Sequence, residues 1–509
     1  MFHVPLYFEA LRTRPVLVFW LATLAQALLW FLVPLLFYWA PPGDLAQVLA
    51  VGHEFPIESD FGPPLAYWLA EIAFRAAGTA GVYALAQLCL IATYWCVFAL
   101  GRAIVGPRHA IMAVLLMVGI SVFTVPTPDF GPAILAMALW SATLLFYWRA
   151  VFEGSRRYWF AAGAAAALLL LSTEGALILL GALCLFTAMT RRGRAASNTI
   201  DAWIVATCLI FVLFAHVYWL QRLGGVMPVL ARLRDAGLAA GNTGAWLRLL
   251  VLLIIAHAGL VVLVVLASGW PRTRINPAPA ILRAPADRSA ATFVKVFALL
   301  PAMLATIAAV LIGESQPLGG SAPLLLLSGL AVIVLCHDSI ELRHQRILGF
   351  AWTGLLLVPA LLVPVAIVVM PWAIGSDLRV AQPASAMGRF FAESFERRTA
   401  HPLAVVSGDM RTAALIALAA PSRPSIYFAA DPQRSPWVTP ADIRDKGAVI
   451  VWPAAGTDPA PPADIKARFP DLVPEVPRSF ERPVRGRLPP LLIGWGMIRP
   501  ARAPGSTPQ

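Results

Sequence analysis

Charged side chains are scarce in this chain of 509 residues. Only 13% of the residues are Asp, Glu, Lys or Arg, whereas 59% are hydrophobic and the mean hydropathy is +0.74. Soluble domains carry about 25% charged residues, so the composition excludes a wholly soluble protein. Apolar runs of about 18 residues or more recur, each long enough to cross about 30 Å of hydrocarbon as a helix. We therefore expect an integral membrane protein.

Cysteine is also rare, and its pattern indicates no chemistry. All five cysteines lie inside apolar runs, at Cys89, Cys96, Cys184, Cys208 and Cys336. Their spacing matches no zinc or redox motif and implies no disulfide framework.

Arginine supplies most of the positive charge behind the net value of +12. The arginines fall in short clusters between the apolar runs, which is typical of topology signals and not of a nucleic-acid surface. With the N-terminus in the cytoplasm, most of them lie in cytoplasmic segments. The first apolar run, 15–39, is too long for a cleaved signal and is followed by a poor cleavage site, so we expect a retained span.

The predicted fold class is an all-α polytopic membrane protein with a small C-terminal α/β soluble domain. We expect about eleven transmembrane helices, near residues 15–39, 80–101, 109–125, 131–149, 158–172, 175–190, 200–221, 246–269, 292–313, 322–337 and 347–373. The run 158–190 has arginines at both ends and is predicted to be a hairpin that turns at 172–175. An odd number of spans puts the C-terminal region outside, so the predicted domains are 1–373 and 374–509.

The C-terminal region has a different pattern from the rest of the chain. It is rich in proline, more charged, and alternates short strand and helix signals, which favours an α/β unit. Strands are predicted at 403–407, 425–429, 448–452 and 491–495, and helices at 409–420 and 439–446. The region contains no glycine-rich phosphate fingerprint, and we expect it to serve recognition or capping.

The stretch 41–68, between the first two long apolar runs, is unusually acidic for this chain. Its charged side chains are Asp44, His53, Glu54, Glu58 and Asp60. Two short amphipathic helices are expected, one from Leu45 and one after Pro63-Pro64, both lying in the membrane interface. Asp44 has two compatible interpretations: it caps the first of these helices, or it is a general base that takes a proton from an acceptor hydroxyl.

Two other carboxylates are predicted at outer ends of spans. Asp129 lies in a very short loop, where it caps the next helix or faces Asp44 across a cavity as a second catalytic carboxylate. Glu174 lies at the predicted hairpin turn, where it is an interfacial turn residue or lines a wet, substrate-binding cavity.

Three further interpretations concern binding. The side chains of His53, Glu54 and Asp60 contact substrate, or together with Glu58 they hold a divalent metal ion or form a solvated loop. Their spacing matches no established ligand pattern, so no cofactor is assigned. The outer arginines face lipid headgroups or form a phosphate clamp, since a guanidinium matches phosphate oxygens in a bidentate manner. These arginines are Arg222, Arg232, Arg234 and Arg248.

Five motifs stand out along the first part of the chain: the early Asp44, the stretch 50–54 (AVGHE), the stretch 60–69 (DFGPPLAYWL), the stretch 101–106 (GRAIVG) and the pair Pro128-Asp129. Together they resemble the membrane glycosyltransferases of the GT-C superfamily, in particular protein O-mannosyltransferases and aminoarabinose transferases of lipid A. The chain departs from the family where Leu45 follows Asp44 instead of a second acidic residue, and where Glu174 stands in place of a frequent lysine.

The resemblance implies an inverting sugar transfer at the outer face of a bacterial cytoplasmic membrane. A polyprenyl-phosphate sugar would be the donor, a lipid, glycan or protein hydroxyl the acceptor, and Asp44 the general base. Two other classes remain open: a lipid or sugar transporter or flippase, and a non-catalytic protein that binds lipid-linked sugar. A transporter favours charged residues at mid-span and inverted repeats, and neither is evident here.

Overall fold

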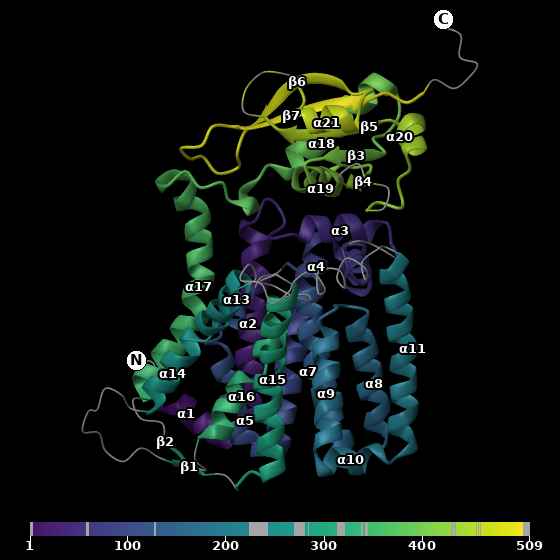
Figure 1. Cartoon of the computed structure of the whole chain (residues 1–509). Helices are drawn as coiled ribbons and strands as arrows, with labels where there is room; N and C mark the ends of the chain where they lie inside the picture. The colour runs from purple at the N-terminus through teal and green to yellow at the C-terminus, as the bar shows by residue number, and fades with distance from the viewer. Residues whose placement is uncertain are drawn as a thin grey trace, which may run out of the picture. The chain divides into compact units, whose positions relative to one another are not determined.

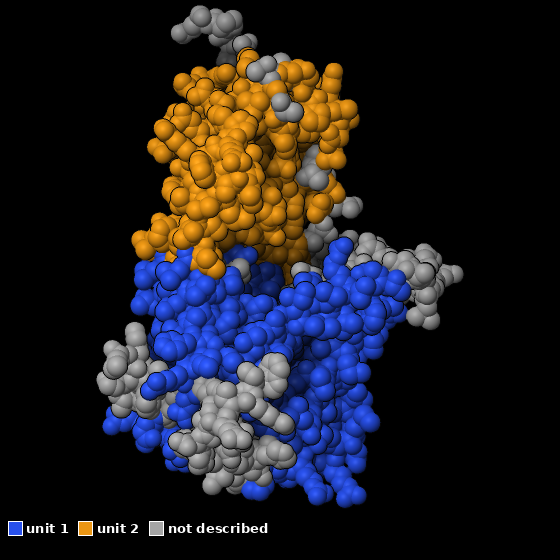
Figure 2. Space-filling view, turned by 90° about the vertical axis from the view of Figure 1, so that its left-hand side faces the viewer, with its two compact units in different colours: residues 1–32, 84–361 blue, residues 33–83, 362–509 orange. Residues whose placement is uncertain are grey.

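A computed structural model describes residues 4–57, 61–126, 129–222, 243–268, 280–282, 285–312, 321–336, 339–341, 345–428, 431, 434–454, 456, 458 and 460–501. The chain forms two compact units that do not follow chain order (Figure 2). Residues 1–32 and 84–361 form the first unit, and residues 33–83 and 362–509 form the second. The acidic stretch after the first apolar helix therefore belongs to the same unit as the C-terminal region.

The first unit is built of apolar helices. Figure 1 shows many of them running side by side, for example α7, α8 and α9. The helices that lie wholly in this unit are α1 (Val4–Thr13), α5 (Pro107–Met117), α6 (Ser121–Thr124), α7 (Pro132–Val151), α8 (Arg157–Leu170), α9 (Ala176–Met189), α10 (Arg191–Ser197), α11 (Ile200–Arg222), α13 (Thr243–Ala256), α14 (Ala258–Ser268), α15 (Arg288–Ile312), η2 (Ala322–Leu325) and α16 (Ser328–Leu335). A small antiparallel pair, β1 (Ala280–Leu282) with β2 (Ser339–Glu341), completes its described elements.

Three long helices run from one unit into the other: α2 (Pro15–Phe37), α4 (Leu65–Val105) and α17 (Gln345–Ala373). The 41 residues of α4 would extend about 60 Å as a straight helix, twice the hydrocarbon thickness. The helix is broken at Ala77 and Gly78, where Gly78 takes φ +61° and ψ −150°. The sequence predicts this division, since it places a short helix after Pro64 and a span that begins near residue 80.

The composition of the helices confirms a multi-pass membrane protein. Six described helices are long and apolar enough to cross a membrane, or seven if the bent pair α9–α10 is one span. Each of the eleven predicted runs coincides with an apolar helix or helix pair, but several are shorter than a full span, so the total count stays a prediction. The predicted hairpin is confirmed, since α8 and α9 meet at residues 171–175. Many large apolar side chains on these helices are exposed, such as Leu361 and Phe211, as lipid-facing surfaces require.

The second unit contains a five-stranded mixed sheet in the order β4-β3-β5-β7-β6. Parallel pairing joins β3 (Val405–Gly408) to β4 (Ser425–Phe428) and to β5 (Ala448–Pro453). Antiparallel pairing joins β5 to β7 (Leu491–Ile498) and β7 to β6 (Val473–Phe480). The predicted α/β class and all four predicted strands are confirmed, while the edge strand β6 is additional.

Short helices connect and cover this sheet. They are α3 (Leu45–His53), η3 (Arg379–Ala381), α18 (Ala384–Thr399), α19 (Met410–Ala419), α20 (Pro440–Lys446) and α21 (Ala463–Arg468). Helix α19 packs against both α18 and α3. The close approach of α18 and α19 requires a glycine, because a Cβ on Gly388 would lie 2.5 Å from the Ala419 carbonyl carbon. The acidic stretch is thus packed onto the α/β region through α3 and α19.

Candidate functional site

Asp44 immediately precedes α3, and its carboxylate is not used as a helix cap. The backbone carbonyl of Asp44 accepts from Gln47 and Val48, but its side chain makes no capping hydrogen bond. The side chain is 68% exposed, and the charged group facing it is Arg379, whose Nη1 lies 3.8 Å from Oδ1. An exposed carboxylate that the fold does not use for capping is available for chemistry at the surface.

The backbone around Asp44 is held by η3. The Val380 carbonyl accepts from the amides of Trp39 and Ala40, at 2.9 and 3.1 Å, and Gly43 supplies the positive φ of +55° that turns the chain into α3. These bonds bring Arg379 next to Asp44. The residues meet at a shallow cleft of about 10 Å³, room for about one water molecule.

Two guanidinium groups line this cleft together with the Asp44 carboxylate. Arg379 comes from η3 and Arg411 from the first turn of α19, and both are exposed. The predicted phosphate clamp involved other arginines, and the sequence pattern did not single out these two. They lie far along the chain from Asp44, so only the packing of α19 and η3 on α3 reveals them.

A second charged cluster surrounds Glu71 on α4. The Glu71 side chain is only 2% exposed. Its Oε1 accepts from Arg75 Nε at 2.9 Å and lies 3.1 Å from His53 Nδ1, while its Oε2 accepts from Arg423 Nη2 at 2.8 Å. A carboxylate this buried costs several kcal/mol of desolvation unless it is paired, and here three basic side chains surround it.

Arg423 occupies the turn between α19 and β4 with a positive φ of +49°. Its guanidinium lies 4.6 Å from the centre of the Phe74 ring. Burial lowers the pKa of Arg423, and the charge of Glu71 offsets part of that change. Its Nη1 and the Oε1 of Glu54 are buried, and neither has a hydrogen-bond partner within the described ranges. His53 and Glu54 therefore belong to a buried charged cluster. A solvated loop was one of the interpretations that the sequence allowed for them.

The other predicted site residues fall in different places. Asp129 is half-buried between α6 and α7, Glu174 is half-buried in the turn between α8 and α9, and Arg248 is exposed on α13; all three belong to the first unit. Arg222 is the last residue of α11. Asp60, Arg232 and Arg234, and Glu58 beside Asp60, lie outside the described residues. Among the residues that the structure does describe, no group of three His, Cys, Asp or Glu side chains is arranged to hold a metal ion.

Comparisons with known proteins support the resemblance in the sequence motifs. Residues 62–219 match the family model of dolichyl-phosphate-mannose-protein mannosyltransferases. This match confirms the resemblance to GT-C glycosyltransferases over that range, which includes the Gly62–Leu69 and Gly101–Gly106 motifs and begins after Asp44. No curated protein matches the chain in sequence.

Two solved structures match the chain over much of its length. ArnT from Cupriavidus metallidurans, solved bound to undecaprenyl phosphate, is 12% identical with a TM-score of 0.43, covering 97% of this chain and 99% of that one. The oligosaccharyltransferase AglB from Archaeoglobus fulgidus, solved with an inhibitory peptide and a dolichol-phosphate, is 14% identical with a TM-score of 0.42, covering 86% and 69%.

Proposed function

We propose, from the match of residues 62–219 to dolichyl-phosphate-mannose-protein mannosyltransferases, that this chain is a membrane glycosyltransferase. It moves a sugar from a polyprenyl-phosphate donor to a hydroxyl group of a lipid, glycan or protein acceptor. The family match carries the proposal, and the many apolar helices supply the bilayer setting that such a donor needs. The reaction takes place at the outer face of the bacterial cytoplasmic membrane, with the N-terminus in the cytoplasm.

Asp44 is the proposed general base. Its exposed carboxylate accepts the proton of the acceptor hydroxyl while the hydroxyl oxygen attacks C1 of the donor sugar. The bond between C1 and the phosphate oxygen breaks, its electron pair leaves with the polyprenyl phosphate, and C1 is inverted. Proton transfer of this kind contributes typically 10²–10⁴-fold to a rate.

Arg379 and Arg411 are proposed to bind the leaving phosphate. Both guanidinium groups are exposed beside Asp44, so they can meet a phosphate at the surface and not inside the small cleft, and a planar guanidinium donates to two phosphate oxygens at once. Their positive charge would stabilise the negative charge that develops as the bond to C1 breaks. The sequence pattern suggests the same role for another set of arginines: Arg222, Arg232, Arg234 and Arg248.

The remaining predicted residues receive supporting roles. Asp129 keeps the sequence-based proposal of a second catalytic carboxylate, and Glu174 that of a substrate contact. His53 and Glu54 are proposed to act indirectly, since they belong to the charged cluster around Glu71.

The class of activity is tested with the purified full chain in lipid vesicles. Polyprenyl-phosphate mannose carrying a label on its sugar is the probe donor, and the free polyprenyl phosphate and labelled product are measured with and without a cell-envelope extract as acceptor source. A transferase releases polyprenyl phosphate in step with labelled product. Movement of intact labelled lipid between leaflets, with no bond cleavage, would instead identify a flippase and contradict the proposal.

A further inference from the structure

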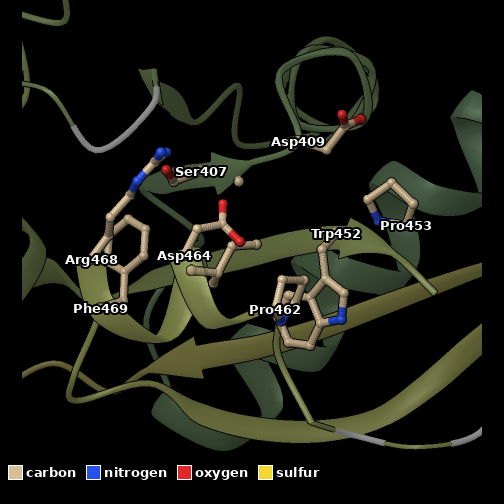
Figure 3. A pocket seen from close by; sticks show the side chains of 10 residues that line it. Ser407, Asp409, Trp452, Pro453, Pro462, Asp464, Arg468 and Phe469 are labelled. Carbon is tan, nitrogen blue, oxygen red and sulfur yellow. The ribbon is translucent and has the colours of Figure 1, made fainter.

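A second pocket lies within the α/β region and shares no lining residue with the cleft beside Asp44. It has a volume of about 210 Å³ and opens at the carboxyl ends of β3 and β5 (Figure 3). Its lining comes from three segments: the end of β3 with the start of α19, the end of β5, and α21 with the residues beside it. None of the residues predicted to act in sugar transfer lines it.

The sheet topology makes this crevice a natural place for a ligand. From β3 the chain passes through α19 to β4 on one side, whereas β5 lies on the other side of β3 and leads away through α21 toward β6. The connections from these two neighbouring parallel strands therefore run in opposite directions. Ligands of open α/β sheets bind at such a switch point, outside the carboxyl ends of the strands.

The backbone at the switch point is tightly constrained. Gly408 ends β3 with a φ of +111°, and a Cβ there would lie 1.9 Å from the Val451 carbonyl oxygen. The next amide, of Asp409, donates to that same carbonyl at 2.8 Å. Trp452 and Phe469 are almost fully buried and form an apolar floor. The pocket is thus built on a rigid base, as precise binding requires.

The polar groups of the pocket include both donors and acceptors. Asp464 and Arg468 are exposed and lie one helical turn apart on α21. In Figure 3 the Asp464 carboxylate points from α21 toward the end of β3, on the side of the pocket where Ser407 and Arg468 lie. Asp409 is also part of the lining, and its Oδ2 accepts from the amide and hydroxyl of Thr412, which holds its carboxylate in place.

This combination of groups discriminates between ligand classes. The exposed Asp464 carboxylate disfavours phosphate and other anions, and the Arg468 guanidinium one turn away offsets its charge and so weakens the attraction for a free metal cation. A saccharide suits both the carboxylate and the guanidinium, because each of its hydroxyl groups donates and accepts. Its C–H face can pack on the exposed apolar side chains of Pro453 and Pro462. The volume lies below the 300–1,000 Å³ of pockets for drug-sized ligands, which suits a single sugar ring.

We propose that this pocket binds a neutral sugar unit, as the recognition site for a saccharide-containing acceptor. Its use for an acceptor rests on the proposed transferase function, but sugar binding itself does not require that function. Asp464 accepts from sugar hydroxyls, Arg468 donates to them, and the exposed Pro453 and Pro462 offer apolar contact to the ring.

Binding is measured on the full chain in lipid nanodiscs by saturation-transfer NMR, with the methyl glycosides of mannose, glucose, galactose and N-acetylglucosamine as probes. We expect at least one of them to bind, and Asp464→Asn or Arg468→Gln to weaken that binding about tenfold or more, since each removes a charged hydrogen-bonding group. The matched controls are Asp445→Asn on α20 and Lys466→Gln on α21, both exposed and outside the lining, and they should bind as the unmodified chain does.

Three results would overturn the inference. They are absence of binding for every probe, equal weakening in the control variants, and displacement of the bound glycoside by inorganic phosphate at equal concentration. Asp44→Asn separates this site from the transfer chemistry, because it should leave glycoside binding unchanged even if it abolishes turnover. Loss of transferase activity alone therefore does not test whether the pocket binds sugar.

Discussion

Arg423 Nη2 donates to Glu71 Oε2 across 2.8 Å, and this bond joins the turn after α19 to the first part of α4. The two residues are far apart in sequence, yet each is mostly buried. The pair, with His53 and Arg75, ties the acidic stretch and the start of α4 to the α/β region. The position of α3, and therefore of Asp44, depends on that attachment.

Replacing Glu71 should destabilise the second unit strongly. Glu71→Gln leaves the buried Arg423 charge unpaired, a change that costs about 3–5 kcal/mol. Thermal unfolding of the full chain in detergent measures this loss. The double variant Glu71→Gln with Arg423→Gln should lose less stability than the sum of the losses of the two single variants, because no unpaired partner charge is then left between these two residues.

The control for this prediction is Arg75→Gln. Arg75 also donates to Glu71, but its side chain is 55% exposed, so its ion pair contributes at most about 1 kcal/mol. Equal losses of stability for Arg75→Gln and Glu71→Gln would contradict the prediction, because the contribution of the cluster would then not depend on the burial of its ion pairs.

Gly78 should resist substitution although nothing crowds it. Its φ of +61° with ψ of −150° lies in a region adopted almost only by glycine, and a Cβ there would meet no atom within 4 Å. Gly78→Ala should therefore cost about 1–3 kcal/mol through backbone strain alone. The melting temperature of the full chain measures the cost. Gly181→Ala in α9, which also meets open space but in helical backbone, should be neutral or stabilising.

Gly408 should tolerate even less change, since both its φ and its surroundings exclude a side chain. Gly408→Ala adds a clash with the Val451 carbonyl to about 1–3 kcal/mol of backbone strain. We expect a lower melting temperature together with loss of glycoside binding. Gly456→Ala, where a Cβ meets nothing within 4 Å, is the control, and an equal effect there would contradict the prediction.

The stability contribution of Asp442 should depend on pH. Hydrogen bonds from Lys446 and Thr439 hold the pKa of Asp442 well below its usual range. A carboxyl with a lowered pKa stabilises the folded state above its unfolded pKa of about 3.9, and this contribution is lost as pH falls toward the folded pKa. Asp442→Asn should lower the melting temperature at pH 7 and progressively less below pH of about 4. Asp445→Asn, at an exposed position on the same helix, serves as the control, and an equal loss in the two variants would contradict the prediction.

Much of the fold follows from local patterns in the sequence. Apolar runs locate the helices, the acidic turn at 172–175 marks the α8–α9 hairpin, and short apolar stretches mark β3, β4, β5 and β7. Strand β6 escaped prediction because Pro474 and Pro477 interrupt its pattern. Prolines are tolerated there because β6 pairs on one side only, as the edge of the sheet.

The candidate site was less accessible to prediction than the fold. Asp44 stands out as an early acidic residue in an apolar chain, but its neighbours Arg379 and Arg411 come from the C-terminal region. Glu71 sits on what looks like the polar face of a short helix with Arg75, and nothing local indicates that Arg423 covers it. Such contacts depend on how elements distant in the sequence pack together, and the hydrophobic periodicity of the sequence does not indicate this packing.

The central claim is that Asp44 is the general base of a sugar transfer from a polyprenyl-phosphate donor. The most direct test measures both donor binding and turnover of Asp44→Asn in vesicles, with polyprenyl-phosphate mannose as the probe. Asp377→Asn is the control, because Asp377 is another exposed aspartate of the same unit that pairs with an arginine, Arg482. The account predicts that Asp44→Asn binds the donor normally but loses about 10²–10⁴-fold in turnover, while Asp377→Asn keeps both. Turnover by Asp44→Asn at the rate of the unmodified chain would contradict it.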